Sequence, residues 1–122
     1  MTVPDSAPPQ PIGFYRPVVR AGEWIVCSGQ LGLVDGELVS GGVAAQLSQA
    51  VANLEALLVS EGASLANVVK TTVFLVDMDA FAEMNDAYAA AFGDSKPARS
   101  AVGVAALPRG GAVEIEAWAR LG

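Results

Sequence analysis

Apolar residues recur at helical spacing between residues 43 and 61. They form one stripe along a predicted helix, made of Leu47, Ala50, Val51, Leu54, Leu57 and Leu58. Four polar residues lie off this stripe: Gln46, Gln49, Asn53 and Glu55. Gly62 follows as a natural stop, because glycine readily takes the left-handed conformation that ends many helices.

A second helix is predicted from residue 79 to residue 92. Its apolar stripe consists of Phe81, Met84, Tyr88 and Phe92. Asp79 can cap the N-terminus, since an aspartate side chain accepts hydrogen bonds from the first free backbone N–H groups. Gly93 then ends the helix.

Short segments rich in β-branched and aromatic residues predict the strands. They are residues 15–19, 23–28, 68–76, 99–105 and 112–121. Pro17 places the first of them at a sheet edge. Residues 29–32 are expected to break the second strand, and Asp35-Gly36 predicts a hairpin turn between residues 33–34 and 37–39.

The predicted order of strands, helix, strand, helix and strands is typical of an α+β domain, with two helices packed on one face of a mixed β-sheet. Residues 1–11 hold four of the seven prolines and are predicted to be a flexible Pro-rich N-terminal arm. Residues 12–122 are predicted to form a single domain. Because the helices can cover one face only, the other face should need a partner, and we expect an oligomer.

Composition and charge exclude several classes of protein. The chain of 122 residues is 52% hydrophobic and 16% charged, too apolar for a disordered protein. No run of about 18 uncharged apolar residues indicates a membrane-spanning helix. The 13 acidic and 7 basic residues give a net charge of −6, without a basic run that could contact phosphates. We therefore expect neither a nucleic acid nor a membrane as partner.

Histidine is absent, and Cys27 is the only cysteine. The first fact removes histidine general bases, Ser-His-Asp triads and nearly every common zinc site. The second excludes an internal disulfide, and a thiol without a partner fits a reducing compartment. Residues 1–11 have neither a basic residue nor an apolar core, so they do not predict a signal peptide. We expect a cytoplasmic protein without a metal site.

Three charged residues in the C-terminal third could carry chemistry. Arg99 opens a predicted strand just after Pro97, and its planar guanidinium could bind a carboxylate bidentately. From residue type alone, an ordinary surface arginine is an equally good interpretation. Glu114 and Glu116 lie on one face of a predicted strand. That face could simply be solvated, or one acid could face a pocket and handle water, and periodicity does not decide between these.

Other candidates are less specific. The backbone of Ser28-Gly29-Gln30 could contact a ligand, although a plain turn is the commoner meaning of such a glycine. Cys27 has no neighbouring base and is interpreted as an inert buried thiol. Tyr15 could pack or offer a hydroxyl to a site, and Asn85 is undecided. The residues alone do not name a substrate.

The segment Pro97-Ala98-Arg99-Ser100-Ala101-Val102, continuing to Ala105, Leu107 and Val113-Glu114-Ile115, resembles the C-terminal motif of the RidA (YjgF/YER057c) family. Further agreement lies in Ile12-Gly13-x-Tyr15, Ser28-Gly29-Gln30, the Gln46 to Leu54 helix, residues 69–75 and Asn85-x-x-Tyr88. The resemblance covers residues 12–121. It implies a chorismate-mutase-like α+β fold and a homotrimer, with the sheets packed inward and three clefts between subunits.

The activity implied by this resemblance is hydrolytic deamination of reactive 2-enamine and 2-imine acids. Examples are 2-aminoacrylate and 2-iminopropanoate, and the products are 2-keto acids and ammonia. No metal or organic cofactor is implied. The resemblance places Arg99 at the substrate carboxylate and Glu114 at the acid that positions the attacking water.

Five more residues are interpreted in the same way. Tyr15 and Gly29 match residues that line the cleft, Gly29 through its backbone, and Asn85 matches a position at the cleft edge. Ala101 stands where many family members have cysteine, so only its backbone could contact the ligand. Phe14 replaces a common proline and could alter the cleft mouth.

Two alternatives to an enzyme stay open. One is a non-catalytic trimer of the same family that binds small carboxylates or has a regulatory role. The presence of both Arg99 and Glu114 favours the enzyme, because a protein that only binds carboxylates needs the arginine but not the glutamate that positions water. The other is a nucleic-acid or chaperone role, and the acidic balance argues against RNA binding.

Overall fold

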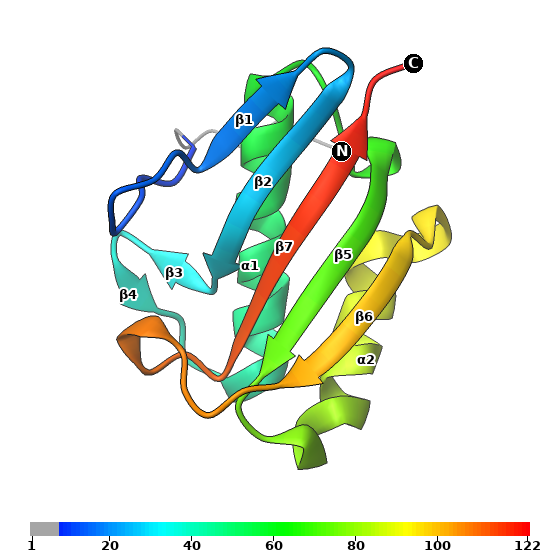
Figure 1. The fold of residues 1–122 in the computed structure, drawn as a ribbon. Coiled ribbons are helices and arrows are strands. Elements are labelled where there is room, and N and C mark those ends of the chain that lie inside the picture. The colour runs from blue at the N-terminus through cyan, green and yellow to red at the C-terminus, as the bar shows by residue number, and fades with distance from the viewer. Residues whose placement is uncertain (1–7) are drawn as a thin grey trace.

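The computed structural model describes residues 8–122, which form a five-stranded sheet with two α-helices against one of its faces (Figure 1). The strands are β1 (Val18–Ala21), β2 (Trp24–Leu31), β5 (Val68–Leu75), β6 (Ala98–Gly103) and β7 (Val113–Arg120). The helices are α1 (Gly42–Ser60) and α2 (Phe81–Phe92). The predicted α+β architecture is confirmed. Residues 1–7 of the predicted arm lie outside the described residues.

The strand order is β1-β2-β7-β5-β6. Strands β5 and β6 are parallel and joined through α2, whereas the other pairs are antiparallel, so the sheet is mixed as predicted. A separate ribbon pairs β3 (Leu33–Val34) with β4 (Glu37–Leu38). Its turn residues, Asp35 at φ 51° and Gly36 at φ 82°, are both left-handed, which confirms the predicted hairpin turn. Four short 3₁₀ turns connect other elements: η1 (Leu65–Asn67), η2 (Met78–Ala80), η3 (Gly93–Ser95) and η4 (Pro108–Gly110).

The two faces of the sheet differ sharply. Every second residue of β7 is fully buried under the helices: Val113, Ile115, Ala117 and Ala119. The residues between them point to the opposite face, called the open face below: Glu114, Glu116, Trp118 and Arg120. By register, Trp24, Phe74 and Val102 share that face. Trp24, Val102 and Trp118 are 39%, 40% and 47% exposed, so this chain alone leaves apolar side chains uncovered.

Strand β2 is longer than its sequence predicts. The expected break at residues 29–32 is wrong, because the strand continues to Leu31 through a β-bulge between Cys27 and Gln30. Cys27 pairs with Ala117 and Gln30 with Ile115, so β2 advances three residues where β7 advances two. A bulge absorbs one extra residue while the hydrogen-bonded ladder continues on both sides. Strand β1 begins only at Val18, directly after Pro17, and lies at the sheet edge as predicted.

The start of the second helix also differs from its prediction. Helix α2 begins at Phe81 and is preceded by η2. The capping residue is Asp77, whose Oδ1 accepts a hydrogen bond from the backbone N–H of Asp79 at 2.9 Å. Asp79 is therefore not the cap, because the 3₁₀ turn comes first and needs an acceptor two residues earlier.

Helix α1 matches its predicted extent, but two of its polar residues are buried rather than off the packed face. The Asn53 side chain donates hydrogen bonds to the backbone oxygens of Leu31 and Leu33, both at 3.1 Å. The Gln46 side chain accepts one from the backbone N–H of Ala112 at 2.9 Å. These bonds attach α1 to the end of β2 and to the start of β7.

By length and composition α1 could cross a membrane, yet half of that stretch is buried within the described fold. Its buried residues pack against the sheet and α2, which is typical of the core helix of a globular domain. The helix is accordingly interpreted as part of the core.

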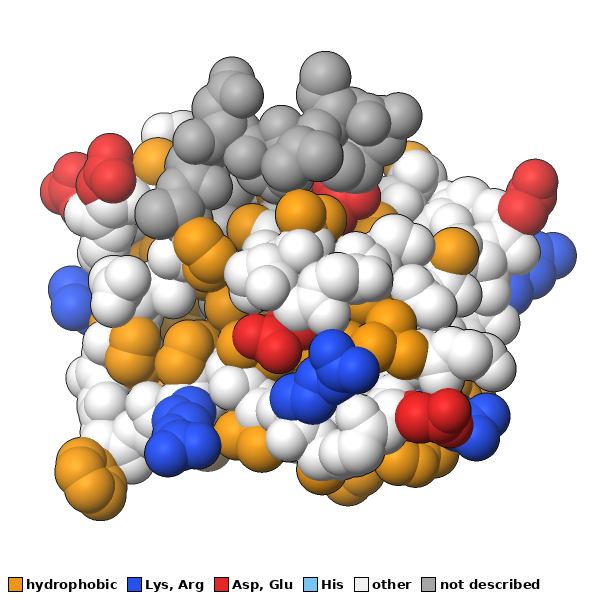
Figure 2. Space-filling model, turned by 90° about the horizontal axis from the view of Figure 1, so that it is seen from above, with side chains coloured by type: hydrophobic (Ala, Val, Ile, Leu, Met, Phe, Trp, Pro, Cys, Tyr) orange, Lys and Arg blue, Asp and Glu red, His pale blue; other side chains and the backbone are white. Residues whose placement is uncertain are grey.

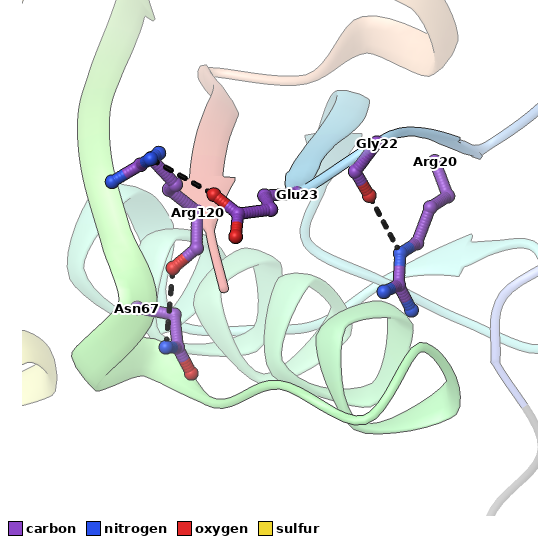
Figure 3. A network of polar contacts seen from close by, with 5 residues as sticks. All are labelled: Arg20, Gly22, Glu23, Asn67 and Arg120. Atoms are coloured by element: carbon purple, nitrogen blue, oxygen red, sulfur yellow. Dashed lines mark hydrogen bonds and ion pairs between the residues drawn. The ribbon is translucent and has the colours of Figure 1, made fainter. Parts of the chain in front are cut away.

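The end of the sheet where β7 finishes carries charges of both signs among hydrophobic side chains (Figure 2). Arg120 pairs with Glu23 at 2.8 Å, and Asn67 donates to the backbone oxygen of Arg120 at 3.3 Å (Figure 3). Arg20 donates to the backbone oxygen of Gly22 at 3.1 Å. Because the ion pair is exposed, it contributes at most about 1 kcal/mol.

Candidate active site

One half of the predicted site lies where the β2 bulge faces Glu114. Tyr15, Gly29 and Glu114 line the same cleft, together with Ser28 and Glu116. The cleft has a volume of about 860 Å³ and extends under residues 8–12 to one side of α1. We call it the Glu114 cleft. Three of the six predicted site residues therefore share one cavity.

Gly29 and the Glu114 side chain are in direct contact across this cleft. A Cβ atom on Gly29 would lie 2.8 Å from Cδ and 2.9 Å from Oε2 of Glu114, closer than real Cβ contacts allow. Only glycine therefore leaves the carboxylate in its observed place. The contact follows from the β-bulge, which brings the Gly29 backbone towards β7.

The environment of Glu114 suits proton transfer. The side chain is partly buried, and this burial raises the pKa of its carboxyl group. The nearby negative charge of Glu116 raises the same pKa further. A carboxylate with a raised pKa accepts a proton more readily than an ordinary surface glutamate.

The other half of the predicted site lies around Arg99 on β6. The Arg99 Nη1 atom donates a hydrogen bond to Asn85 Oδ1 at 2.8 Å. Its Cζ atom lies 4.7 Å from the centre of the Tyr88 ring and 5.6 Å from that of Phe81. These contacts from α2 fix the plane of the guanidinium.

The aromatic support beneath Arg99 is itself held in place. The Tyr88 hydroxyl lies 2.7 Å from the fully buried Thr71 Oγ1, and its ring stacks on Phe92 at 4.5 Å. Burial raises the pKa of Tyr88, while the Thr71 hydrogen bond and the Arg99 charge lower it. Tyr88 thus belongs to the core, as the apolar stripe predicts, and also supports the arginine.

Arg99 has no carboxylate partner among the described residues, where the one ion pair joins Arg120 to Glu23. A guanidinium has five N–H donors, so donors are left for a bidentate anion. The arginine lines a second cavity of about 310 Å³, called the Arg99 pocket. Its residues are Asn85, Tyr88, Ala89, Phe92, Gly93, Lys96, Pro97 and Arg99.

The two halves do not meet within one chain. Arg99 pairs in register with Thr71, which is buried on the helix-covered face, and it contacts α2 there. Glu114 pairs with Phe74 and lies on the open face. The sheet separates the guanidinium from the carboxylate, so one small molecule cannot contact both within a single chain.

The remaining candidates have different places. Ala101 lines neither cavity and packs against the core beside Val73. Phe14 is fully exposed next to Tyr15. Lys96, which is not among the six predicted site residues, shares the Arg99 pocket, and its spacing of three residues from Arg99 was the available signal.

Metal and thiol chemistry find little support in the described part of the chain. Residues 8–122 contain no group of three or more Cys, Asp or Glu side chains placed to hold a metal ion. Burial, and to a lesser extent the negative charge of Glu61, raises the pKa of Cys27 to about 12. The thiol is therefore protonated and unreactive at neutral pH, in line with its interpretation from sequence.

The chain is similar to proteins of known sequence and structure along most of its length. The "2-iminobutanoate/2-iminopropanoate deaminase" of Mus musculus is 49% identical over 91% of this chain and 84% of that protein. The YjgF gene product of E. coli has a TM-score of 0.90 and 38% identity, covering 100% of this chain and 99% of that one. The E. coli TdcF structure with bound serine has a TM-score of 0.88 and 34% identity, covering 93% of both chains.

A family model described as Endoribonuclease L-PSP matches residues 5–121, nearly the whole chain. Together with the near-complete structural match to the YjgF gene product, this agrees with the resemblance carried by the motif around Arg99 and Glu114. The chain belongs to the Endoribonuclease L-PSP family, which is the RidA/YjgF family.

Proposed function

We propose that this protein hydrolyses reactive 2-imino acids, and the 2-enamine acids that tautomerise to them, to 2-keto acids and ammonia. The observation that carries the proposal is Arg99, a guanidinium held flat by Asn85 and Tyr88 without a carboxylate partner in the described chain. Such a group is ready to bind a small carboxylate. The relatives named 2-iminobutanoate/2-iminopropanoate deaminases support the same chemistry at 45–49% identity.

The proposed working form is a homotrimer in which the Arg99 pocket of one chain meets the Glu114 cleft of the next. Two observations support an assembly. Arg99 and Glu114 lie on opposite faces of the sheet, so a complete site needs two chains. The open face also exposes Trp24, Val102 and Trp118, which a second copy would cover. The trimeric number follows the family resemblance.

In the proposed reaction, Arg99 binds the substrate carboxylate and thereby places the imine carbon near the partner subunit's Glu114. The glutamate accepts a proton from water as the water oxygen bonds to the carbon of the protonated imine, whose C=N π electrons move to nitrogen, giving a tetrahedral aminoalcohol. The protonated glutamate then donates its proton to the amino nitrogen. The C–N bond breaks as the hydroxyl proton passes to the glutamate, which releases it to water, and ammonia leaves the 2-keto acid. An imine is already electrophilic, so placement contributes more than activation.

The proposal is tested by following an imine that an amino-acid oxidase generates from alanine. Semicarbazide traps the 2-iminopropanoate, and hydrolysis competes with trapping. We expect the protein at micromolar concentration to suppress formation of the trapped product and to speed release of pyruvate. If the protein binds pyruvate but leaves the trapped product unchanged, the non-catalytic carboxylate-binding trimer is correct and the deaminase proposal is wrong.

The family name Endoribonuclease L-PSP refers to RNA cleavage, and we do not propose that activity for this chain. RNA binding needs cationic contacts to phosphates, and the net charge of −6 opposes it. On the face shown in Figure 2, acidic and basic side chains are interspersed and do not form a continuous basic patch. We propose a cytoplasmic location, which the free buried thiol of Cys27 supports.

A further inference from the structure

The Arg99 pocket contains a second cation. Lys96 and Arg99 both line this cavity, and no aspartate or glutamate is among its lining residues. This is notable in a chain with 13 acidic and only 7 basic residues. The pocket therefore combines two positive charges with an apolar wall of Tyr88, Phe92 and Pro97.

The backbone at Lys96 does not favour a lysine. Its φ of 32° and ψ of 64° are left-handed, a conformation that glycine adopts far more easily. Pro97 follows directly, and a residue before proline normally prefers an extended conformation. Strain of this kind is often found where a side chain serves a site. The presence of lysine at this position is therefore explained by its side chain and not by its backbone conformation.

The size of the Arg99 pocket suggests a role for the Lys96 side chain. A substrate such as 2-iminopropanoate carries one carboxylate, which Arg99 alone can hold. The cavity of about 310 Å³ is much larger than such a molecule needs. A substrate of four or five carbons with a carboxylate at each end would place one end at the arginine and leave the other in the same cavity, which Lys96 also lines.

We propose that Lys96 extends the substrate class to 2-imino dicarboxylic acids by contacting their second carboxylate. The inference rests on the proposed deaminase function and deepens it. The local positive charge also offsets the repulsion that a protein of net charge −6 exerts on a dianion. Lys96 is accordingly a specificity residue and takes no part in the proton transfers.

The test compares two imines made in place by oxidases, 2-iminoglutarate from glutamate and 2-iminopropanoate from alanine. For Lys96→Gln we expect the ratio of dicarboxylate to monocarboxylate kcat/KM to fall about five- to tenfold, the size of a partly exposed ion pair. Lys96→Arg should keep the ratio within about twofold. Arg20→Gln is the matched control, because it removes one exposed positive charge from β1, at the opposite edge of the sheet from β6.

Calorimetric binding of 2-oxoglutarate, the stable product, is measured in parallel and does not depend on turnover. We expect Lys96→Gln to weaken its binding about five- to tenfold more than it weakens pyruvate binding. Equal effects on both acids would overturn the role of Lys96 while leaving the deaminase proposal intact. If the wild-type protein binds both acids but hydrolyses neither imine, the proposed function fails, and the binding ratio still decides whether Lys96 selects dicarboxylates.

Discussion

Replacing Arg99 with alanine is expected to lower kcat/KM for 2-iminopropanoate by about 30- to 1,000-fold, a loss of roughly 2–4 kcal/mol of transition-state stabilisation. The variant loses both carboxylate binding and the placement of the imine carbon. The thermal midpoint should change little, since Arg99 makes one side-chain hydrogen bond and two cation–π contacts at a partly exposed site. Semicarbazide competition measures the rate, and circular dichroism checks the fold.

Two further variants make this result specific to the guanidinium. Arg99→Lys keeps the positive charge but cannot form the planar two-point contact, so its activity should lie between wild type and Arg99→Ala. Arg20→Ala removes an exposed arginine on β1 and should stay within about twofold of wild type. Wild-type turnover by Arg99→Ala would refute the role of the arginine.

Replacing Glu114 with glutamine is expected to lower kcat by about 100- to 10,000-fold, the usual contribution of a general acid–base group. Glutamine keeps the shape against Gly29 but accepts no proton from water. Substrate affinity should persist, because the proposed contact with the substrate carboxylate comes from Arg99 rather than from Glu114. Single-turnover kinetics with pyruvate release measure the chemical step. A kcat within threefold of wild type would mean that another group handles the proton.

Gly29→Ala tests the position of the same carboxylate without removing it. The new Cβ would lie 2.9 Å from Oε2 of Glu114, so the flexible side chain must move. A displacement of about 1 Å can cost about 100-fold in rate. We expect a clear drop in kcat with only a small change in the free energy of unfolding, because the clash is with a side chain.

The raised pKa of Glu114 also makes the stability effect of Glu114→Gln depend on pH. Burial disfavours the ionised carboxylate in the folded state. Below the ordinary glutamate pKa, Glu114 is neutral in both the folded and the unfolded chain, and its burial does not lower the stability of wild type. As pH rises through the raised pKa of the folded state, the free energy of unfolding of wild type falls. Glu114→Gln should therefore have a larger free energy of unfolding than wild type at pH 8, and urea titrations should show that difference vanish near pH 3.

Local patterns predicted most of the fold. The apolar stripe of α1, the Asp35-Gly36 turn and the alternation along β7 each depend on neighbouring residues, and each is confirmed. The β2 bulge was not predictable, because it depends on register against β7, more than 80 residues away in the chain. The burial of Gln46 and Asn53 was missed for a related reason, since their partners are backbone groups of Ala112 and Leu31, distant in the chain.

The candidate site was predictable as chemistry but not as geometry. The guanidinium and the paired glutamates suggest an anion clamp and an acid from residue type alone, and the family motif names their roles. Which sheet face each side chain takes depends on the pairing of β6 with β5 and of β5 with β7. That register places Arg99 and Glu114 on opposite faces, which no local pattern contains.

Mixing Arg99→Ala chains with Glu114→Gln chains tests directly whether one site draws on two subunits. The two purified variants are unfolded together in equal amounts and refolded, with wild type carried through the same steps as control. In random trimers a site takes its arginine from one chain and its glutamate from the next, so about one half times one half, or about a quarter, of the sites are intact. If each site is shared between two subunits, the mixture should recover about a quarter of the control activity. Activity no higher than the average of the two separate variants would contradict it, because every chain would then carry a defective site of its own.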